Sequence, residues 1–191
     1  MEKSMNKIKI AVKLFFFAMV TLLFPSSLIA KPMPSDLTEL IINSDLIAIV
    51  DVFEIESRGK SFPGSASATI SKIIQGQSKN PEIKMYWEGS SIYGLGKWVV
   101  FLKRKENGYY ATYGARSFWK VDQAKIEYIE CCSPFVVLQP PVNSLNIDPS
   151  LTSMSRVYID GVPREYNPIR AKGIEIDKLI NYIENLTKKD K

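Results

Sequence analysis

Hydrophobic residues in the central part of the chain fall into runs of six to ten residues that alternate with polar residues or are continuously apolar. Runs of this length, bounded by Gly, Pro, Ser and Asn, are typical of β-strands. The first run is apolar on both faces over its first half, and in the third run Ile83, Met85 and Trp87 share one face. The predicted strands are Leu46–Ile55, Ala66–Ile74, Glu82–Trp87, Lys97–Arg104 and Tyr109–Gly114.

The last two of these strands are predicted to form a β-hairpin. Asn107-Gly108, the preferred pair for a two-residue turn, lies between them and would place Leu102 opposite Tyr113. One face would then contain Trp98, Val100, Leu102, Ala111 and Tyr113, and the other Val99, Phe101, Lys103, Tyr110 and Thr112. Most aromatic rings of this hairpin are therefore predicted to form part of the barrel wall. The cations at 103–105 are predicted to lie in solvent at the tip of the hairpin.

Helical patterns flank the strands at both ends. Asp36 and Glu39 have the spacing of a helix-capping pair, and apolar residues at helical spacing predict an amphipathic helix from Glu175 to Lys188. That helix would cover the outer face of the strand that contains Trp98. Further short strands are predicted at 117–121, 125–129 and 156–159. The predicted organisation is a signal peptide (1–30), a barrel domain (31–130), an irregular connector with a short strand (131–174) and the C-terminal helix (175–191).

The N-terminus has the order of a secretory signal peptide. Four lysines precede the apolar run Leu14–Phe24, which is shorter than the roughly 20 residues a membrane-spanning helix needs, and small residues follow it. Cleavage after Ala30 would remove these lysines and Glu2, and would lower the formal charge from +5 to +2. An uncleaved N-terminal anchor is the alternative. We therefore expect a periplasmic or secreted protein that contacts the membrane only through this segment.

Composition limits the chemistry further. The chain contains no histidine, which excludes Ser-His-Asp and Cys-His catalysis and removes the commonest ligand of transition metals. No phosphate-binding loop or nucleophile motif is present, so no cofactor and no metal are predicted. The small positive charge of the mature chain does not favour nucleic-acid binding, which needs clustered cations.

Four short segments lie between Ser44 and Val121, namely SDLIAIVDVFEIES, ATISKIIQG, GKWVVFL and, after a turn, Gly108-Tyr-Tyr. In these segments the chain resembles the secreted bacterial domains related to the netrin module and to the tissue inhibitors of metalloproteinases. The resemblance implies an OB-type fold, a five-stranded Greek-key barrel whose usual binding surface lies on strands two and three. Inhibitors of this family chelate zinc through an N-terminal cysteine, whereas the predicted mature N-terminus is Lys31-Pro32. That inhibitory mechanism therefore does not carry over.

Three groups of residues are candidate sites. The aromatic and basic residues of the third strand and the following loop could bind a ligand, or could serve as core and loop anchors. These candidates are Lys84, Tyr86, Trp87, Tyr93 and Lys97. The adjacent Cys131 and Cys132 could form a vicinal disulfide, form an intermolecular bond, or remain thiols with no special role. Glu54 and Glu56 share a strand face, where paired acids could act in catalysis but more often form a solvated edge.

The sequence as a whole predicts a mainly β, OB-type barrel with a short N-terminal helix and a C-terminal amphipathic helix. Its predicted function is that of a noncatalytic extracytoplasmic binding module that recognises a protein or another envelope component. One alternative is an envelope enzyme that uses carboxylates, which would require two acids converging in a pocket. The other is a module that binds a glycan or nucleic acid through exposed aromatic rings.

Overall fold

A computed structural model of the protein describes residues 34–56, 64–88, 92, 94–122, 134–138, 142–157 and 169–189, all in one compact unit that begins at Pro34. Several predictions lie outside the described residues. These are the signal peptide, the strand at 125–129, Tyr93, and the pair Cys131-Cys132.

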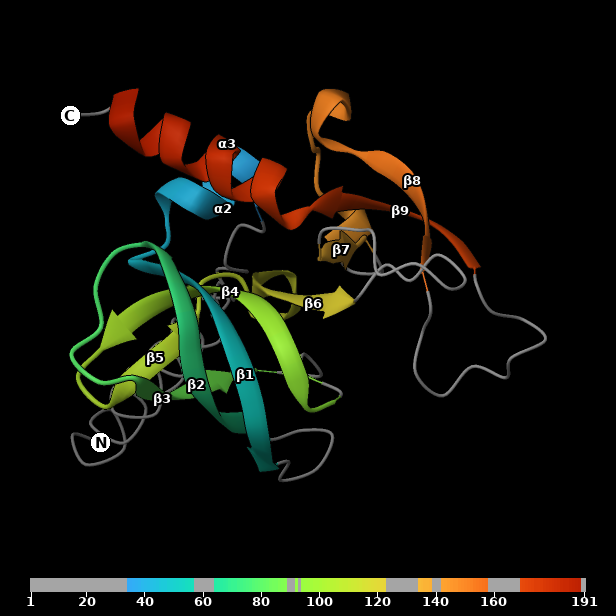
Figure 1. Ribbon diagram of the computed structural model, residues 1–191. Coiled ribbons are helices and arrows are strands. Elements are labelled where there is room, and N and C mark those ends of the chain that lie inside the picture. The colour runs from blue at the N-terminus through green and yellow to red at the C-terminus, as the bar shows by residue number, and fades with distance from the viewer. Residues whose placement is uncertain are drawn as a thin grey trace, which may run out of the picture. The chain divides into compact units, whose positions relative to one another are not determined.

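Five strands close into an OB-type Greek-key barrel, as predicted (Figure 1). Their order is β1-β2-β3-β5-β4, and pairing between β1 and β4 closes the ring. The pair β3–β5 is parallel, while the other pairs of the barrel are antiparallel. The strands are β1 (Leu46–Glu56), β2 (Gly64–Gln75), β3 (Glu82–Trp87), β4 (Gly96–Lys105) and β5 (Gly108–Ala111).

The alternation of side chains along these strands produces two hydrophobic clusters. Inward residues fill the barrel, among them Trp98, Val100 and Leu102 of β4, which are fully buried. The residues between them on β4, Val99 and Phe101, point outward and belong to a second cluster. β4 is therefore covered on both sides, which explains its continuous run of apolar residues.

Two helices supply the outer cover of β4. The short helix α2 (Leu37–Ile42) and the C-terminal helix α3 (Ile176–Lys189) contact each other and contribute to the same cluster as Phe101. The apolar stripe of α3 consists of Ile176, Leu179, Ile180 and Ile183, all buried. The apolar residues whose spacing predicted this helix are therefore the residues that the helix buries.

Helix α2 begins with the predicted capping pair. The carboxylate of Asp36 accepts a hydrogen bond from the Glu39 backbone N–H at 2.7 Å. The Glu39 carboxylate in turn accepts one from the Ser35 N–H at 2.8 Å, one residue before the N-cap. The Asp36 bond satisfies a donor that a helix start leaves unpaired, and the Glu39 bond ties the preceding residue to the first turn of this six-residue helix.

A second group of strands extends the sheet from β4. These strands follow in the order β6-β7-β9-β8. Their bounds are β6 (Phe118–Asp122), β7 (Phe135–Val137), β8 (Ser153–Val157) and β9 (Ile169–Glu175). The prediction of one short strand between 131 and 174 was incomplete, because this region contains β7, β8 and nearly all of β9. Glu175 ends β9, and α3 begins at Ile176.

The predicted register of the β4–β5 hairpin is wrong. Lys105 pairs with Gly108 and Leu102 pairs with Ala111, so the turn residues are 106–107. Gly108 lies in the strand with φ of 137°, where an added Cβ would lie 3.0 Å from Cε2 of Tyr86. The glycine therefore permits the close approach of β5 to β3 instead of forming the turn. The shift is two residues on one strand, so Leu102 and Ala111 still share the inner face.

Candidate binding face on the barrel

The candidate residues of β3 divide between the two faces of the strand. Ile83, Met85 and Trp87 point inward, and Trp87 is only 5% exposed. Its ring meets Phe118 edge to face, with the centroids 5.5 Å apart. Trp87 is therefore a core residue with no open ring face for a ligand, which supports the anchor interpretation of this tryptophan.

Lys84 and Tyr86 point outward from β3, where Lys84 is exposed and Tyr86 is half-buried. Lys97 is also exposed, but it lies at the start of β4, opposite Asp51 of β1. The structure thus places Lys84 and Tyr86 on the outer face of β3, whereas Trp87 lies on the inner face. The loop candidate Tyr93 is not among the described residues.

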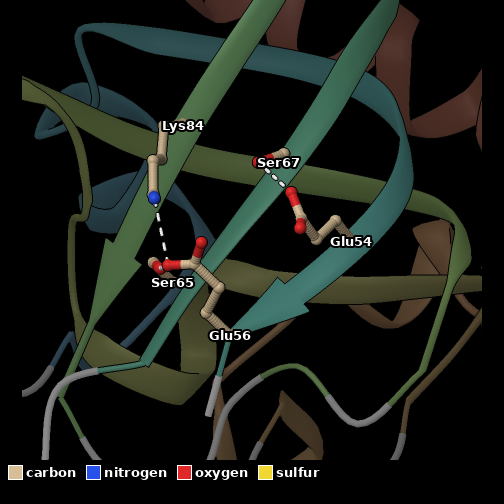
Figure 2. Close-up of polar contacts among 5 residues, drawn as sticks. All are labelled: Glu54, Glu56, Ser65, Ser67 and Lys84. Carbon is tan, nitrogen blue, oxygen red and sulfur yellow. Dashed lines mark hydrogen bonds and ion pairs between the residues drawn. The ribbon is translucent and has the colours of Figure 1, made fainter. Parts of the chain in front are cut away.

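Acidic residues of β1 meet the serines of β2 beside Lys84, as Figure 2 shows. The Glu56 carboxylate accepts a hydrogen bond from the Ser65 hydroxyl at 2.9 Å and forms an ion pair with Lys84 Nζ at 3.0 Å. The Glu54 carboxylate accepts a hydrogen bond from the Ser67 hydroxyl at 3.2 Å. Both glutamates lie on the outer surface because a bulge at Val52/Glu54 adds one residue to β1 and reverses the alternation.

This arrangement does not resemble an acid–base centre. The hydrogen bond to Glu56 raises the pKa of Lys84 above its ordinary value of 10.5, so the amine stays protonated at neutral pH and cannot act as a base toward Ser65. Glu54 and Glu56 are exposed and each is bound to its own serine, so they do not converge. Within the described ranges, no group of three or more Asp, Glu, Cys or His could hold a metal ion.

A stacked pair of tyrosines lies next to the polar cluster. Tyr86 of β3 pairs with Tyr110 of β5, and the rings stack at 5.0 Å between centroids with 25° between planes. Lys105 Nζ lies 4.3 Å from the centroid of Tyr110. The predicted hairpin placed Tyr110 on the same face as Lys103, but Tyr110 was not among the predicted site residues. The parallel β3–β5 pairing that joins the two tyrosines has no local signal in the sequence.

The strand registers order these side chains across the sheet. One row runs from Glu56 through Ser65, Tyr86 and Tyr110 to Lys103, and the next row contains Glu54, Ser67 and Lys84. We call the outward residues Ser65, Ser67, Lys84, Tyr86 and Tyr110 the β2–β3–β5 face. Carboxylates of β1 flank this face on one side and lysines of β4 flank it on the other.

Comparison with known proteins gives no relative from which a role could be inferred. No family model matches the chain, no curated protein matches it, and no solved structure matches it. Among the residues that the structure describes, no helix is both long and apolar enough to cross a membrane.

Proposed function

We propose that the protein is a noncatalytic binding module of the cell envelope that holds a protein partner on the β2–β3–β5 face. The observation on which this rests is the stacked Tyr86–Tyr110 pair with charged residues of both signs around it. Protein interfaces typically have aromatic residues at their centre and polar residues at their rim. The location in the envelope rests on the predicted signal peptide.

The same face is less suited to the other ligand classes. Exposed Glu54 and Glu56 would repel the phosphates of a nucleic acid. A sugar ring needs an open aromatic face, whereas the rings of Tyr86 and Tyr110 stack on each other and Lys105 Nζ lies 4.3 Å from the Tyr110 centroid. The resemblance to netrin-related domains agrees with a binding role but does not identify a ligand. A protein partner therefore fits the described residues best.

Chemical cross-linking in cell-envelope extract tests this function. The full chain with a C-terminal tag is cross-linked, purified and analysed by mass spectrometry, beside the double variant Tyr86→Ser/Tyr110→Ser. We expect the double variant to recover at least about tenfold less of the same partner, since central aromatic residues each contribute roughly 2 kcal/mol or more to an interface.

Leu95→Ser is the matched control, because Leu95 is 56% exposed and lies outside the face. The control should recover the partner at the wild-type level, and circular dichroism should show that all three proteins are folded. If the folded double variant recovers the same partner as wild type, or if wild type recovers none, the proposed function is wrong.

A further inference from the structure

The charges that flank the β2–β3–β5 face are separated by sign. On the β1 side lie Glu54 and Glu56, and on the β4 side lie Lys103 and Lys105, all exposed. The residues between them in the two rows are serines, tyrosines and Lys84, which is already paired with Glu56. The surface therefore runs from negative to positive across the strands.

Part of this charge has no counter-ion within the described part of the chain. Neither Lys103 nor Lys105 forms an ion pair there, whereas Glu54 accepts a hydrogen bond from Ser67 and also interacts electrostatically with Lys84. Opposite charges that pair within a chain are common on sheet surfaces, because cross-strand pairs stabilise the sheet. Here β2, β3 and β5 keep the two signs apart, so a partner could neutralise each separately.

We propose, building on the proposed function, that the partner is an extended polypeptide segment that crosses the strands in one direction. The segment places a basic side chain near Glu54 and Glu56 and an acidic side chain near Lys103 and Lys105. Small or apolar residues between them pack beside the stacked rings of Tyr86 and Tyr110. The charge gradient thereby sets the orientation of the partner on the face.

The dimensions of the barrel set the minimum length of this segment. The path from β1 through β2, β3 and β5 to β4 has four steps of roughly 4.8 Å, or roughly 19 Å in all. An extended chain advances about 3.3 Å per residue, and the barrel wall is curved because β1 pairs with β4, so a segment outside the wall needs at least about six residues to span the path. The basic and acidic residues of the partner should therefore lie at least about six positions apart in its sequence.

Zero-length coupling with a water-soluble carbodiimide tests the orientation directly, because it joins only an amine and a carboxylate in contact. The envelope extract that contains the cross-linking partner is treated with the full chain and analysed by mass spectrometry. Coupling of Lys84 to Glu56, 3.0 Å apart, is the internal positive control. We expect Lys103 or Lys105 to be joined to a partner Asp or Glu, and Glu54 or Glu56 to a partner Lys at least about six residues away.

The orientation is overturned if a partner that depends on Tyr86 and Tyr110 is recovered but shows no coupling at these four residues. It is also overturned if the coupled partner residues lie on separate segments. In both cases the proposed function stands, because it is tested by the tyrosine variants alone. A partner that does not depend on the tyrosines overturns both proposals.

Charge reversal provides a second readout. Lys103→Glu should lower partner recovery at least about threefold at about 0.05 M salt, and the difference should shrink at about 0.5 M salt, where surface charges are screened. Lys172→Glu makes the same change in net charge at an exposed position of β9 and should leave recovery unchanged. Equal recovery by the Lys103 and Lys172 variants at low salt would contradict the charge gradient as an orienting element.

Discussion

Trp87 packs its indole ring against the backbone of Gly64, the first residue of β2. The two residues are paired in the β2–β3 register, and a Cβ added to Gly64 would lie 2.5 Å from Cε2 of Trp87. The ring is also held by Phe118 in the barrel interior. A side chain at residue 64 would therefore have to displace a buried tryptophan.

Replacing Gly64 by alanine should destabilise the protein by about 1–3 kcal/mol, the usual cost of adding atoms to a packed core. The free energy of unfolding in urea, followed by tryptophan fluorescence, measures this change. Gly94→Ala is the matched control, since no atom lies within 4 Å of a Cβ added there, and it should change stability by less than about 0.5 kcal/mol. Equal stability of the two variants would show that Trp87 can move away at no cost.

The sequence alone predicts the face of β3 on which Trp87 lies. It does not predict the polar contacts that neighbouring strands make on the other face. Alternation along β3 alone places Ile83, Met85 and Trp87 on one face, as the structure has them. The contacts of Glu56 with Ser65 and Lys84 depend on a bulge in β1, and a bulge cannot be located from alternation. The core member of the candidate set was therefore predictable, whereas the polar cluster was not.

Helix α3 contributes to stability through one face only. Leu179 and Ile183 are fully buried in the cluster that covers the outer side of β4, while Asn181 is exposed. An isolated helix of 14 residues is marginal in water, so this packing keeps α3 helical.

Shortening Leu179 to alanine should cost about 2–5 kcal/mol, because it leaves a cavity between α3 and the strands. Asn181→Ala, on the opposite face of the same helix, should change stability by no more than about 0.5 kcal/mol. Urea unfolding of both variants gives the comparison. A loss of less than about 1 kcal/mol for the Leu179 variant would mean that α3 is not a structural cover of β4.

At the scale of elements, the sequence predicted all five barrel strands and both helices, because each shows an apolar run, an apolar period or a capping pair. It missed β7 and β9. β7 is only three residues long and directly follows Pro134, which favours an irregular segment. The sequence of β9, IRAKGIE, alternates apolar and polar residues only over its first four positions, before Gly173. The hairpin register was wrong because the contact of Gly108 with Tyr86 is tertiary and overrode the local turn preference.

For the whole molecule, β4 joins the two hydrophobic clusters. Its inner residues belong to the barrel interior, and Val99 and Phe101 on its outer side belong to the cluster with α2 and α3. Loss of the helices would expose one face of a strand whose other face forms the barrel core. We therefore expect the barrel and the helices to unfold in one cooperative transition.

The stability of the whole chain should vary little between pH 6 and 8. A backbone hydrogen bond from Ser150 lowers the pKa of Asp148 below 3.8, so its stabilising effect is lost only as the pH falls through that acidic range. Burial raises the pKa of Tyr113 above 10.0, and the hydrogen bond with Glu56 raises that of Lys84 above 10.5. Both effects are lost only as the pH rises through the alkaline range.

No histidine titrates between these limits. Urea unfolding at pH 6, 7 and 8 should therefore give free energies that agree within about 1.4 kcal/mol, the equivalent of one pKa unit on one group. A larger change would reveal a group with a strongly shifted pKa that the described contacts do not explain.

The closing pair of the barrel also has a kinetic consequence. β1 pairs with β4 through contacts such as Leu46 with Leu102, which are far apart in the chain, and the cluster that joins Leu37 to Ile183 spans still more of it. Folding rates fall as the mean sequence separation of contacts rises, so this topology should fold in milliseconds to seconds, not in microseconds. During that interval the apolar edges of β1 and β4 are open to other chains, and crowded nascent molecules are then exposed to aggregation that the closed native barrel prevents.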